Sequence, residues 1–355
     1  MLWKQPKYYN NFWISKMRKI KIILMCLLLL GVSFTREVLV SIPKGASSSS
    51  IAKQLKEMDI ISNETFFKLK LKLMKRENSF LYGNFLIDPD VPLQDLILQL
   101  QDRNRLALIK VTIPEGYNLY KIDKLLTEVG LIKENEFYSY TTSPNMFRHL
   151  IKDNPYLREE ESVPRLEGFL FPDTYLFEYD TSVEKIVSTM FKNFEKKVIP
   201  LYLDAQMKKT LPIRLRKVLS FYNIISLASL VENEAMVDDE RSMIASVYMN
   251  RMNKRMILGA CPTVLYSRLL KGLPWKETLS YKDTEIESDY NTYLNTGLPP
   301  SPISSPGLKS IQAAMNPAKT PYYYFVSKRD RTHHFSVTEK EHLNWSRKLS
   351  KLDNN

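Results

Sequence analysis

The sequence predicts an α+β protein made of a single N-terminal transmembrane helix, two small α/β modules and a mixed α+β C-terminal domain. Three observations predict this organisation: an apolar run behind a basic tail, a strand–turn–helix pattern that occurs twice, and an apolar helix that ends in two glutamates. With 355 residues, the chain can form about two domains with a sizeable core.

The transmembrane helix is predicted at Ile22–Phe34, an uninterrupted apolar run behind the tail of residues 1–21. The run is shorter than the about 20 residues that usually span a bilayer, and its length also fits a signal peptide. No small-x-small cleavage site follows it, so we expect an uncleaved signal anchor. The tail carries six basic residues and no acid, which predicts a protein of the cell inner membrane with a cytoplasmic N-terminus and with everything after Arg36 exported to the periplasmic side.

The formal net charge of +12 is partly local, because the tail alone contributes +6. The remainder suits a surface that faces anionic lipid or an anionic polymer. No nucleic-acid-binding module is recognisable, and the basic residues concentrate beside the predicted membrane segment. We therefore expect no nucleic-acid partner.

Metal and cofactor chemistry find little support in the sequence. Cys26 and Cys261 lie far apart in different contexts, which argues against a disulfide and against a cysteine-based metal site. His333, His334 and His342 lack zinc-site spacing, and no serine-nucleophile motif is present. We expect neither metal nor cofactor, and a mechanism that rests on carboxylic acids.

The two modules are expected at residues 37–107 and 108–200, where Ile-Pro-Lys-Gly at 42–45 and Ile-Pro-Glu-Gly at 113–116 match at an offset of 71. Each module reads as a strand, a glycine turn and a helix, with N-caps at Ser47–Ser50 and at Asn118. Small units of this kind resemble LysM-like modules, which bind glycan strands. For the first copy, a spacer that holds the rest of the chain off the membrane is the alternative.

The stretch Arg165–Phe177 predicts a hairpin that closes the second module, because Gly168 and the Pro172-Asp173-Thr174 turn lie between aromatic residues. Glu167, beside aromatics that we expect to be exposed, is a candidate for lining a sugar cleft. Thr181–Phe194 predicts an amphipathic helix, and a linker at 200–216 leads into the C-terminal domain, residues 201–355.

The C-terminal domain opens with an apolar helix that places Glu232 and Glu234 at its end. At about 100° per residue, Glu232 falls on the stripe of Phe221, Ile225 and Ala228. Apolar surroundings raise the pKa of a carboxyl, which can then donate a proton as a glycosidase general acid does. The structural alternative is that the helix ends here and both glutamates turn to solvent.

Further elements follow this helix. Asp238–Glu240 starts a second helix, with acids that suit its N-terminal dipole. Cys261–Tyr266 begins another element, and Leu308–Met315 predicts a helix that stops at Asn-Pro. Tyr322–Val326 reads as a buried strand with His333–Ser336 as its hairpin partner. The loops are rich in tyrosine, asparagine and threonine, as a carbohydrate groove is, and as any surface loop is.

Taken together, these segments resemble the endolytic murein transglycosylases of the YceG-like (MltG) family, from the anchor to about His342. The motifs that carry the resemblance are LEGFLFPDTY at 166–175, LASLVENEA at 227–235, ASVYMNRM at 245–252, PTVLY at 262–266, YNTYLNTGLPPSPISSPG at 290–307, AAMNPAKTPYYYFV at 313–326 and HHFSVTEKEH at 333–342. The resemblance implies a single-pass anchor, LysM-like modules, an exported catalytic domain that acts on peptidoglycan glycan strands, and partners among the cell-wall synthases.

The resemblance also implies that Glu232 is the catalytic acid/base. It would protonate the oxygen of the MurNAc–GlcNAc β-1,4 bond and then deprotonate the muramyl O6, whose attack on C1 leaves a 1,6-anhydro end without water. Substrate contacts are implied by motif position at Glu167, Asn250, Tyr290, Asn291 and Tyr293. Cys261 stands where the family usually has aspartate and Asn233 where it commonly has lysine, and the first departure bears on one polar contact of the cleft.

We therefore predict a membrane-anchored lytic transglycosylase, a carbon–oxygen lyase that cuts nascent glycan strands and so limits their length. The alternative from another class is a non-catalytic, membrane-tethered glycan-binding scaffold for cell-wall synthesis. Glu232 with its surrounding motif separates the two, because a pure binder has no need of it.

Overall fold

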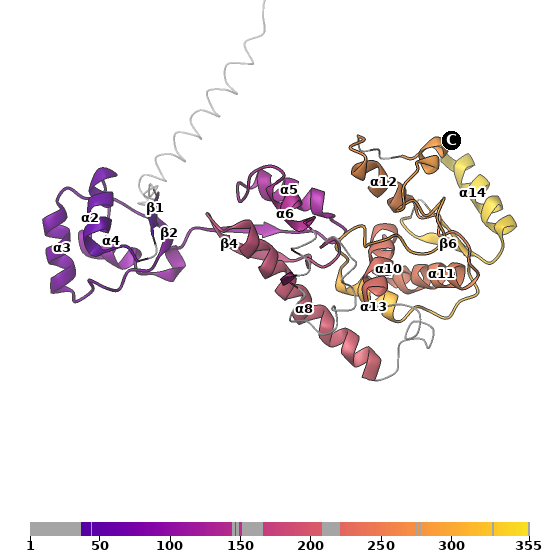
Figure 1. Ribbon diagram of the computed structural model, residues 1–355, viewed down its shortest axis with the longest axis horizontal. Coiled ribbons are helices and arrows are strands. Elements are labelled where there is room, and N and C mark those ends of the chain that lie inside the picture. The colour runs from indigo at the N-terminus through magenta and orange to yellow at the C-terminus, as the bar shows by residue number, and fades with distance from the viewer. Residues whose placement is uncertain are drawn as a thin grey trace, which may run out of the picture. The chain divides into compact units, whose positions relative to one another are not determined.

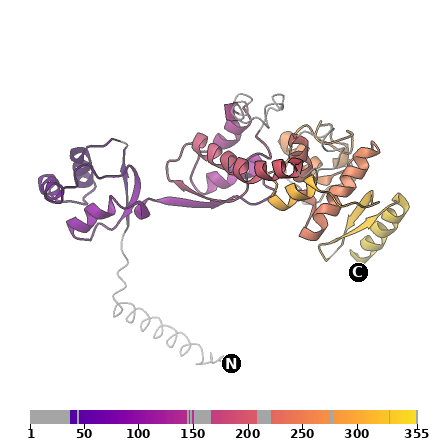
Figure 2. The same ribbon diagram turned by 90° about the horizontal axis from the view of Figure 1, so that it is seen from below.

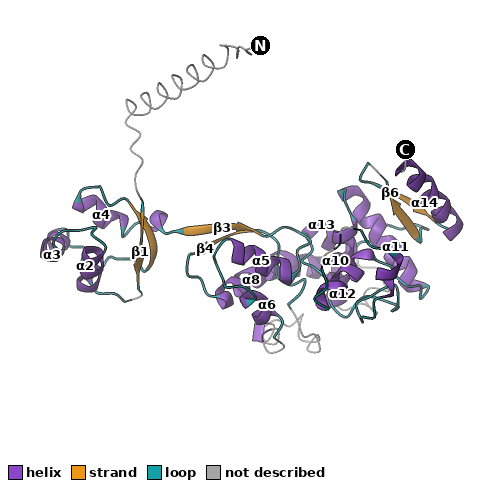
Figure 3. Cartoon of the chain, turned by 90° about the horizontal axis from the view of Figure 1, so that it is seen from above, coloured by secondary structure: helices purple, strands orange, loops and turns teal. Residues whose placement is uncertain are grey.

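The computed structural model describes residues 37–353, except 44, 144–145, 147–148, 151–165, 208–220, 275, 277 and 329. Its mixture of helices and small antiparallel sheets confirms the predicted α+β class (Figures 1 and 3). The chain divides into two compact units, residues 1–107 and 108–355, each with a hydrophobic core of its own. The predicted helix at 22–34 lies outside the described residues, and no described helix is long and apolar enough to cross a membrane.

The first unit is built on the antiparallel strand pair β1 (Val38–Ile42) and β2 (Gly83–Ile87). Helices α2 (Ser48–Glu57) and α3 (Glu64–Leu73) connect the strands, and α4 (Leu93–Gln99) and the short η1 (Arg103–Arg105) follow them. Ser47 caps α2 as predicted, because its side chain accepts a hydrogen bond from the amide of Ser50. The core of this unit contains Val40, Ile51, Leu55, Phe67, Leu71, Phe85 and Ile97.

The second unit opens with the same order of described elements. These are β3 (Leu108–Thr112), α5 (Leu119–Glu128), α6 (Glu136–Thr141) and β4 (Thr174–Glu178), with β3 and β4 antiparallel. Asn118 caps α5, accepting a hydrogen bond from the amide of Lys121 at 2.9 Å. The internal repeat read from the sequence is therefore a strand–helix–helix–strand unit that occurs twice.

Two local predictions in this region are wrong. In the described residues 166–177, the only strand begins at Thr174 and pairs with β3 instead of forming a local hairpin. The reason is that Gly168 takes a φ of +85° while Leu166 and Phe169 are buried in the core. The predicted helix also runs further, as α8 (Val183–Met207), through an exposed Pro200, because apolar residues after Phe194 stay buried.

The rest of the second unit is mainly helical (Figure 2). Its described elements are α10 (Phe221–Glu234), η3 (Asp238–Glu240), α11 (Arg241–Asn253), α12 (Cys261–Leu270), η4 (Tyr281–Glu285), α13 (Leu308–Met315), β5 (Tyr324–Ser327), β6 (His333–Ser336) and α14 (Glu339–Asp353). Helix α13 has the predicted bounds, and β5 and β6 form the predicted antiparallel pair. Strand β5 is partly exposed, not buried as expected.

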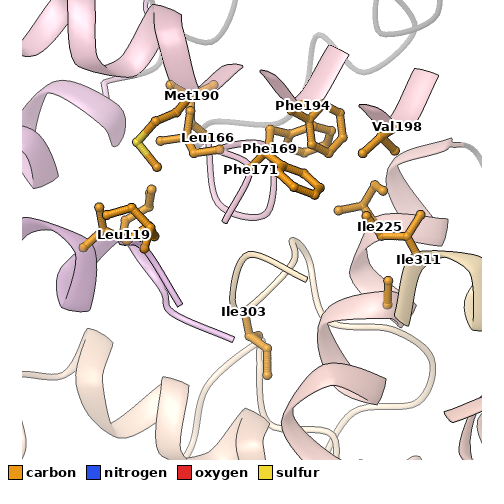
Figure 4. Close-up of a cluster of buried hydrophobic side chains, with 14 of the residues drawn as sticks. Leu119, Leu166, Phe169, Phe171, Met190, Phe194, Val198, Ile225, Ile303 and Ile311 are labelled. Atoms are coloured by element: carbon orange, nitrogen blue, oxygen red, sulfur yellow. The ribbon is translucent and has the colours of Figure 1, made fainter. Parts of the chain in front are cut away.

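One hydrophobic core joins the second module to the helices that follow it (Figure 4). The ring of Phe169 lies 5.3 Å from that of Phe194 in α8 and 5.3 Å from that of Tyr222 in α10. Ile225 of α10 and Ile311 of α13 belong to the same cluster. The boundary expected at 200/201 therefore falls inside α8 and not between compact units.

Gly168 fixes how this core meets the loop of residues 301–307, and its replacement by alanine is expected to destabilise the protein by about 3 kcal/mol. A Cβ there would lie 2.5 Å from Pro302 Cβ and 3.1 Å from Ile225 Cγ2, at a positive φ. Gly130→Ala is the matched control, because Gly130 also has a positive φ (+75°) but no atom within 4 Å of the added Cβ. Urea unfolding measures both free energies, and equal losses would contradict the packing argument.

Candidate active site

Helix α10 places Glu232 where the predicted stripe ends. Phe221, Ile225 and Ala228 are all buried, so the apolar face of the helix is confirmed, and the Glu232 side chain is only 7% exposed. The alternative in which this glutamate turns to solvent is therefore wrong. Its carboxylate, however, does not end among apolar groups, because a charged and a polar donor reach it.

An arginine and a backbone amide hold the Glu232 carboxylate. Oε1 lies 3.2 Å from Nη1 of Arg241, the first residue of α11, in an ion pair that is nearly buried on both sides. Oε2 accepts a hydrogen bond of 3.0 Å from the amide of Gly307. Arg241 is itself fixed by Asp238, whose Oδ1 lies 3.0 Å from Nε, and by the hydroxyl of Ser310. The site thus has one orientation for the carboxylate, set from two sides.

Three segments that are distant in sequence meet at this end of α10. The amide of Gly116 donates to the carbonyl of Ser305 at 2.9 Å, and the amide of Ser305 donates to the carbonyl of Tyr117 at 2.8 Å. The side chain of Asn233 donates to the Ser304 hydroxyl at 2.6 Å. The glycine turn of the second module and the buried loop 301–307 are therefore locked together beside the catalytic candidate.

Glu115, in the glycine turn, brings a second carboxyl to the site. It packs so closely on Gly307 that a Cβ on this glycine would lie 2.0 Å from Glu115 Oε1. Partial burial raises the pKa of Glu115, the neighbouring Glu232 raises it further, and Arg241 and Lys309 oppose the rise. Two neighbouring carboxyls and one arginine are a suitable set for acid–base chemistry.

Glu115 is not among the predicted site residues, although the sequence distinguishes its turn from the first copy. The two matched turns differ in one residue between proline and glycine, lysine at position 44 and glutamate at position 115. Only the second copy lies in the unit that contains Glu232. A change of charge at an otherwise repeated turn favours a functional role for the turn of the second copy.

Glu234 belongs to a different cluster. Burial raises its pKa to about 7, and the Tyr248 hydroxyl, which donates to Oε1 at 3.2 Å, works against that rise. Cys261 and Tyr293 lie nearby, with Sγ and the phenol oxygen 3.2 Å apart. The described contacts of Glu234 do not include Glu232 or its partners, so the two glutamates have separate surroundings.

Glu234 gives a prediction for stability against pH. The folded chain holds this proton up to about pH 7 whereas the unfolded chain releases it near 4.5, so folding stability falls as pH rises through this window. Glu234→Gln removes that loss. In urea unfolding, the free energy of unfolding of the variant relative to that of the wild type is expected to be higher at pH 8 than at pH 5. An unchanged difference between the two proteins at both pH values would contradict the assignment.

Glu167, a predicted cleft residue, is buried and joins two helices. It is 1% exposed, and its carboxylate accepts hydrogen bonds from the amide of Leu119 at 3.2 Å and from the Tyr266 hydroxyl at 2.9 Å. The neighbouring aromatics Phe169 and Phe171 are buried too, so their expected exposure is wrong. Glu167 connects the start of α5 to α12 instead of facing an open groove.

The two asparagines predicted to contact substrate donate hydrogen bonds to backbone carbonyls. The side-chain amide of Asn250 donates to the carbonyls of Thr320 and Tyr322, both at 2.9 Å, and so fastens the segment before β5 to α11. Asn291 is fully buried, and its side-chain amide donates to the carbonyls of Thr284 in η4 and of Ile286 just after it. Their predicted substrate contacts stay predictions, and the described bonds show what these amides position.

The two predicted tyrosines have different partners. The hydroxyl of Tyr290 lies 2.7 Å from that of Ser301, at the start of the loop that reaches Glu232. Tyr293 contacts Cys261 in the cluster around Glu234. Cys261 is exposed, so the position where the family usually has aspartate is open to solvent.

Comparison with known proteins identifies one family. The model of the YceG-like family matches residues 40–348. A Bacillus subtilis protein named endolytic murein transglycosylase is 34% identical over 309 residues, which cover 85% of this chain and 82% of that protein. A Streptococcus pneumoniae protein of the same name is 28% identical over 328 residues, 86% of this chain and 57% of the relative. A crystal structure of a YceG-like protein from Listeria monocytogenes aligns with a TM-score of 0.58 and 31% identity, covering 88% of this chain and 99% of that one.

Proposed function

The chain belongs to the YceG-like family, and from this premise we propose that it is a lytic transglycosylase that cleaves the MurNAc–GlcNAc β-1,4 bond within peptidoglycan strands. The observation that carries the proposal is the pair of carboxyls, Glu232 and Glu115, brought together with Arg241 at the end of α10. The names of the curated relatives support the same reaction class.

The reaction needs one proton donated and one proton removed. The bond between C1 of MurNAc and O4 of GlcNAc breaks as O4 takes a proton, and O6 of the same muramyl residue bonds to C1 as its own proton leaves. No water is consumed, and the pair of carboxyls ends the cycle with as many protons as it had at the start. Arg241, which is ion-paired with Glu232, stabilises negative charge that develops at this site.

Each side chain has a task in this scheme. Glu232, fixed by Arg241 and the Gly307 amide, faces the scissile bond as the acid/base. Glu115 is more exposed, and burial and the neighbouring Glu232 raise its pKa, which favours its protonated form. The rigid contact between the glycine turn and loop 301–307 keeps the two carboxyls in register, which removes the need for rearrangement during the reaction.

The mass of the products tests this function. The full-length chain is incubated with uncross-linked peptidoglycan, and the new ends are identified by mass spectrometry. Ends with 1,6-anhydroMurNAc, lighter than hydrolysed ends by one water, are the expected result. Hydrolysed ends would replace the proposed mechanism by that of a glycosidase, and intact strands that are still bound would favour the glycan-binding scaffold.

The proposal includes the place of the enzyme. We propose that residues 22–34 anchor the chain in the cell membrane with the second unit on the exported side, where it terminates elongating strands, and that both strand–helix–helix–strand modules are LysM-like glycan binders. The basic tail and apolar run support the anchor, and the repeated order of elements supports the modules. Removal of residues 1–36 is expected to shift the chain from the membrane fraction to the soluble fraction, and retention in the membrane fraction would contradict the anchor.

A further inference from the structure

A cavity of about 630 Å³ lies beside the second module. One wall is the start of α5 with Tyr120, Lys121 and Lys124, together with Tyr138 of α6. Further described lining residues lie in α12 and just after it, at 265, 268–270, 272–274 and 276. Both walls belong to the second unit. The cavity therefore lies within one compact unit, where the module meets the helices that follow.

The described lining of this cavity is basic and carries no carboxylate. Its four cations are Lys121, Lys124, Arg268 and Lys276. Asp283 pairs with two of them, because its Oδ1 lies 2.7 Å from Arg268 Nη1 and 2.8 Å from Lys276 Nζ. Glu128 Oε1 lies 4.0 Å from Lys124 Nζ in an exposed pair. The local charge therefore stays positive, and an anionic group entering the cavity is attracted.

The environment of Lys121 strengthens this preference. Its ammonium lies 5.7 Å from the centre of the Tyr117 ring, and burial lowers its pKa. Tyr120 and Tyr138 meet edge to face at 6.2 Å, and leucines of α12 add apolar surface. Charge beside apolar and aromatic surface suits a peptide that carries acids better than a bare inorganic anion.

The cavity lies next to the candidate active site. Asn118 lines it and follows Glu115 by three residues, so their Cα atoms are at most about 11 Å apart. Glu167 holds the two walls together, because its carboxylate binds the amide of Leu119 on one side and the hydroxyl of Tyr266 on the other. A ligand with its backbone at Glu232 can therefore place a side branch in the cavity.

We propose that this cavity binds the carboxylate-bearing peptide stem that branches from the muramyl residues of the glycan strand. The inference rests on the proposed function for the identity of the strand. It adds a second binding site, so that the enzyme binds the peptide stem as well as the sugar. Strands without stems are then poorer ligands, although their scissile bond is the same.

Binding of labelled strands tests the proposal, with intact stems or with stems removed by an amidase. The full-length chain carries Glu232→Gln, so that no strand is cut during the measurement. Intact strands are expected to bind about tenfold more tightly than stripped ones, the effect of one or two charge-assisted hydrogen bonds. Lys121→Gln with Lys124→Gln should abolish this preference, whereas arginine at both positions should keep it.

A matched pair of lysines controls for general charge attraction. Lys192 and Lys196 are exposed on α8 in the same unit and do not line the cavity. Glutamine at both removes the same charge and should leave the preference for stems unchanged, with thermal unfolding midpoints confirming that all variants fold. Equal affinity for intact and stripped strands, equal losses from both lysine pairs, or competition only by a phosphate-bearing polymer would each overturn the proposal. Preference for stems without any cleavage by the wild type would instead leave the cavity assigned and refute the proposed reaction.

Discussion

Glu232→Gln is expected to lower kcat on uncross-linked strands by about 10³-fold while strand affinity changes little. The amide keeps the size of the side chain and a carbonyl oxygen for the Gly307 amide, but it can neither give nor take the proton that the reaction moves. The loss should therefore appear in kcat and not in KM.

Asp239→Asn is the matched control for this substitution, because Asp239 is an exposed acid just beyond α10. It should keep full activity. A Glu232→Gln enzyme that retains more than about a tenth of the wild-type rate would remove Glu232 from the chemistry and leave it as the anchor of Arg241.

Gly307→Ala should lower kcat by about 10²-fold with little loss of stability. The backbone at Gly307 has a φ of −75°, which any residue adopts, so alanine brings no backbone strain. Its Cβ would, however, lie 2.0 Å from Glu115 Oε1, so the Glu115 carboxyl must leave its present position. The substitution therefore disturbs the carboxyl pair without removing either member.

A double-mutant cycle shows whether this effect runs through Glu115. In a Glu115→Ala background, Gly307→Ala has no carboxyl to displace, and we expect no further loss of kcat. Additive losses would mean that Gly307→Ala acts on the loop or on the Glu232 contact, and that the proximity of Glu115 has no catalytic consequence.

Local sequence patterns predicted the parts of the site that a single helix determines. The apolar stripe under Glu232 follows from the period of α10, and Asn118 caps α5 because a polar residue precedes an apolar periodic run. Helix α13 ends where Asn-Pro stops it. Each of these depends on residues within a few turns of one another.

The partners of Glu232 depend on tertiary contacts, so local sequence patterns could not predict them. Glu115 and Gly307 are far from it in sequence, and only the pairing of the glycine turn with loop 301–307 brings them together. Glu167 shows the reverse error: an acid among aromatics suggested a sugar cleft, but burial turned it into a link between α5 and α12. Periodicity reports which face of an element is buried, and it does not report what lies opposite.

The most direct test of the central claim is cleavage of uncross-linked strands in water labelled with heavy oxygen. A transglycosylase that closes O6 onto C1 takes no oxygen from solvent, so the account predicts new muramyl ends without label and lighter than hydrolysed ends by one water. Glu232→Gln should give no new ends of either kind. Labelled ends from the wild type would show that water attacks C1, and would contradict the mechanism in which the strand's own hydroxyl is the nucleophile.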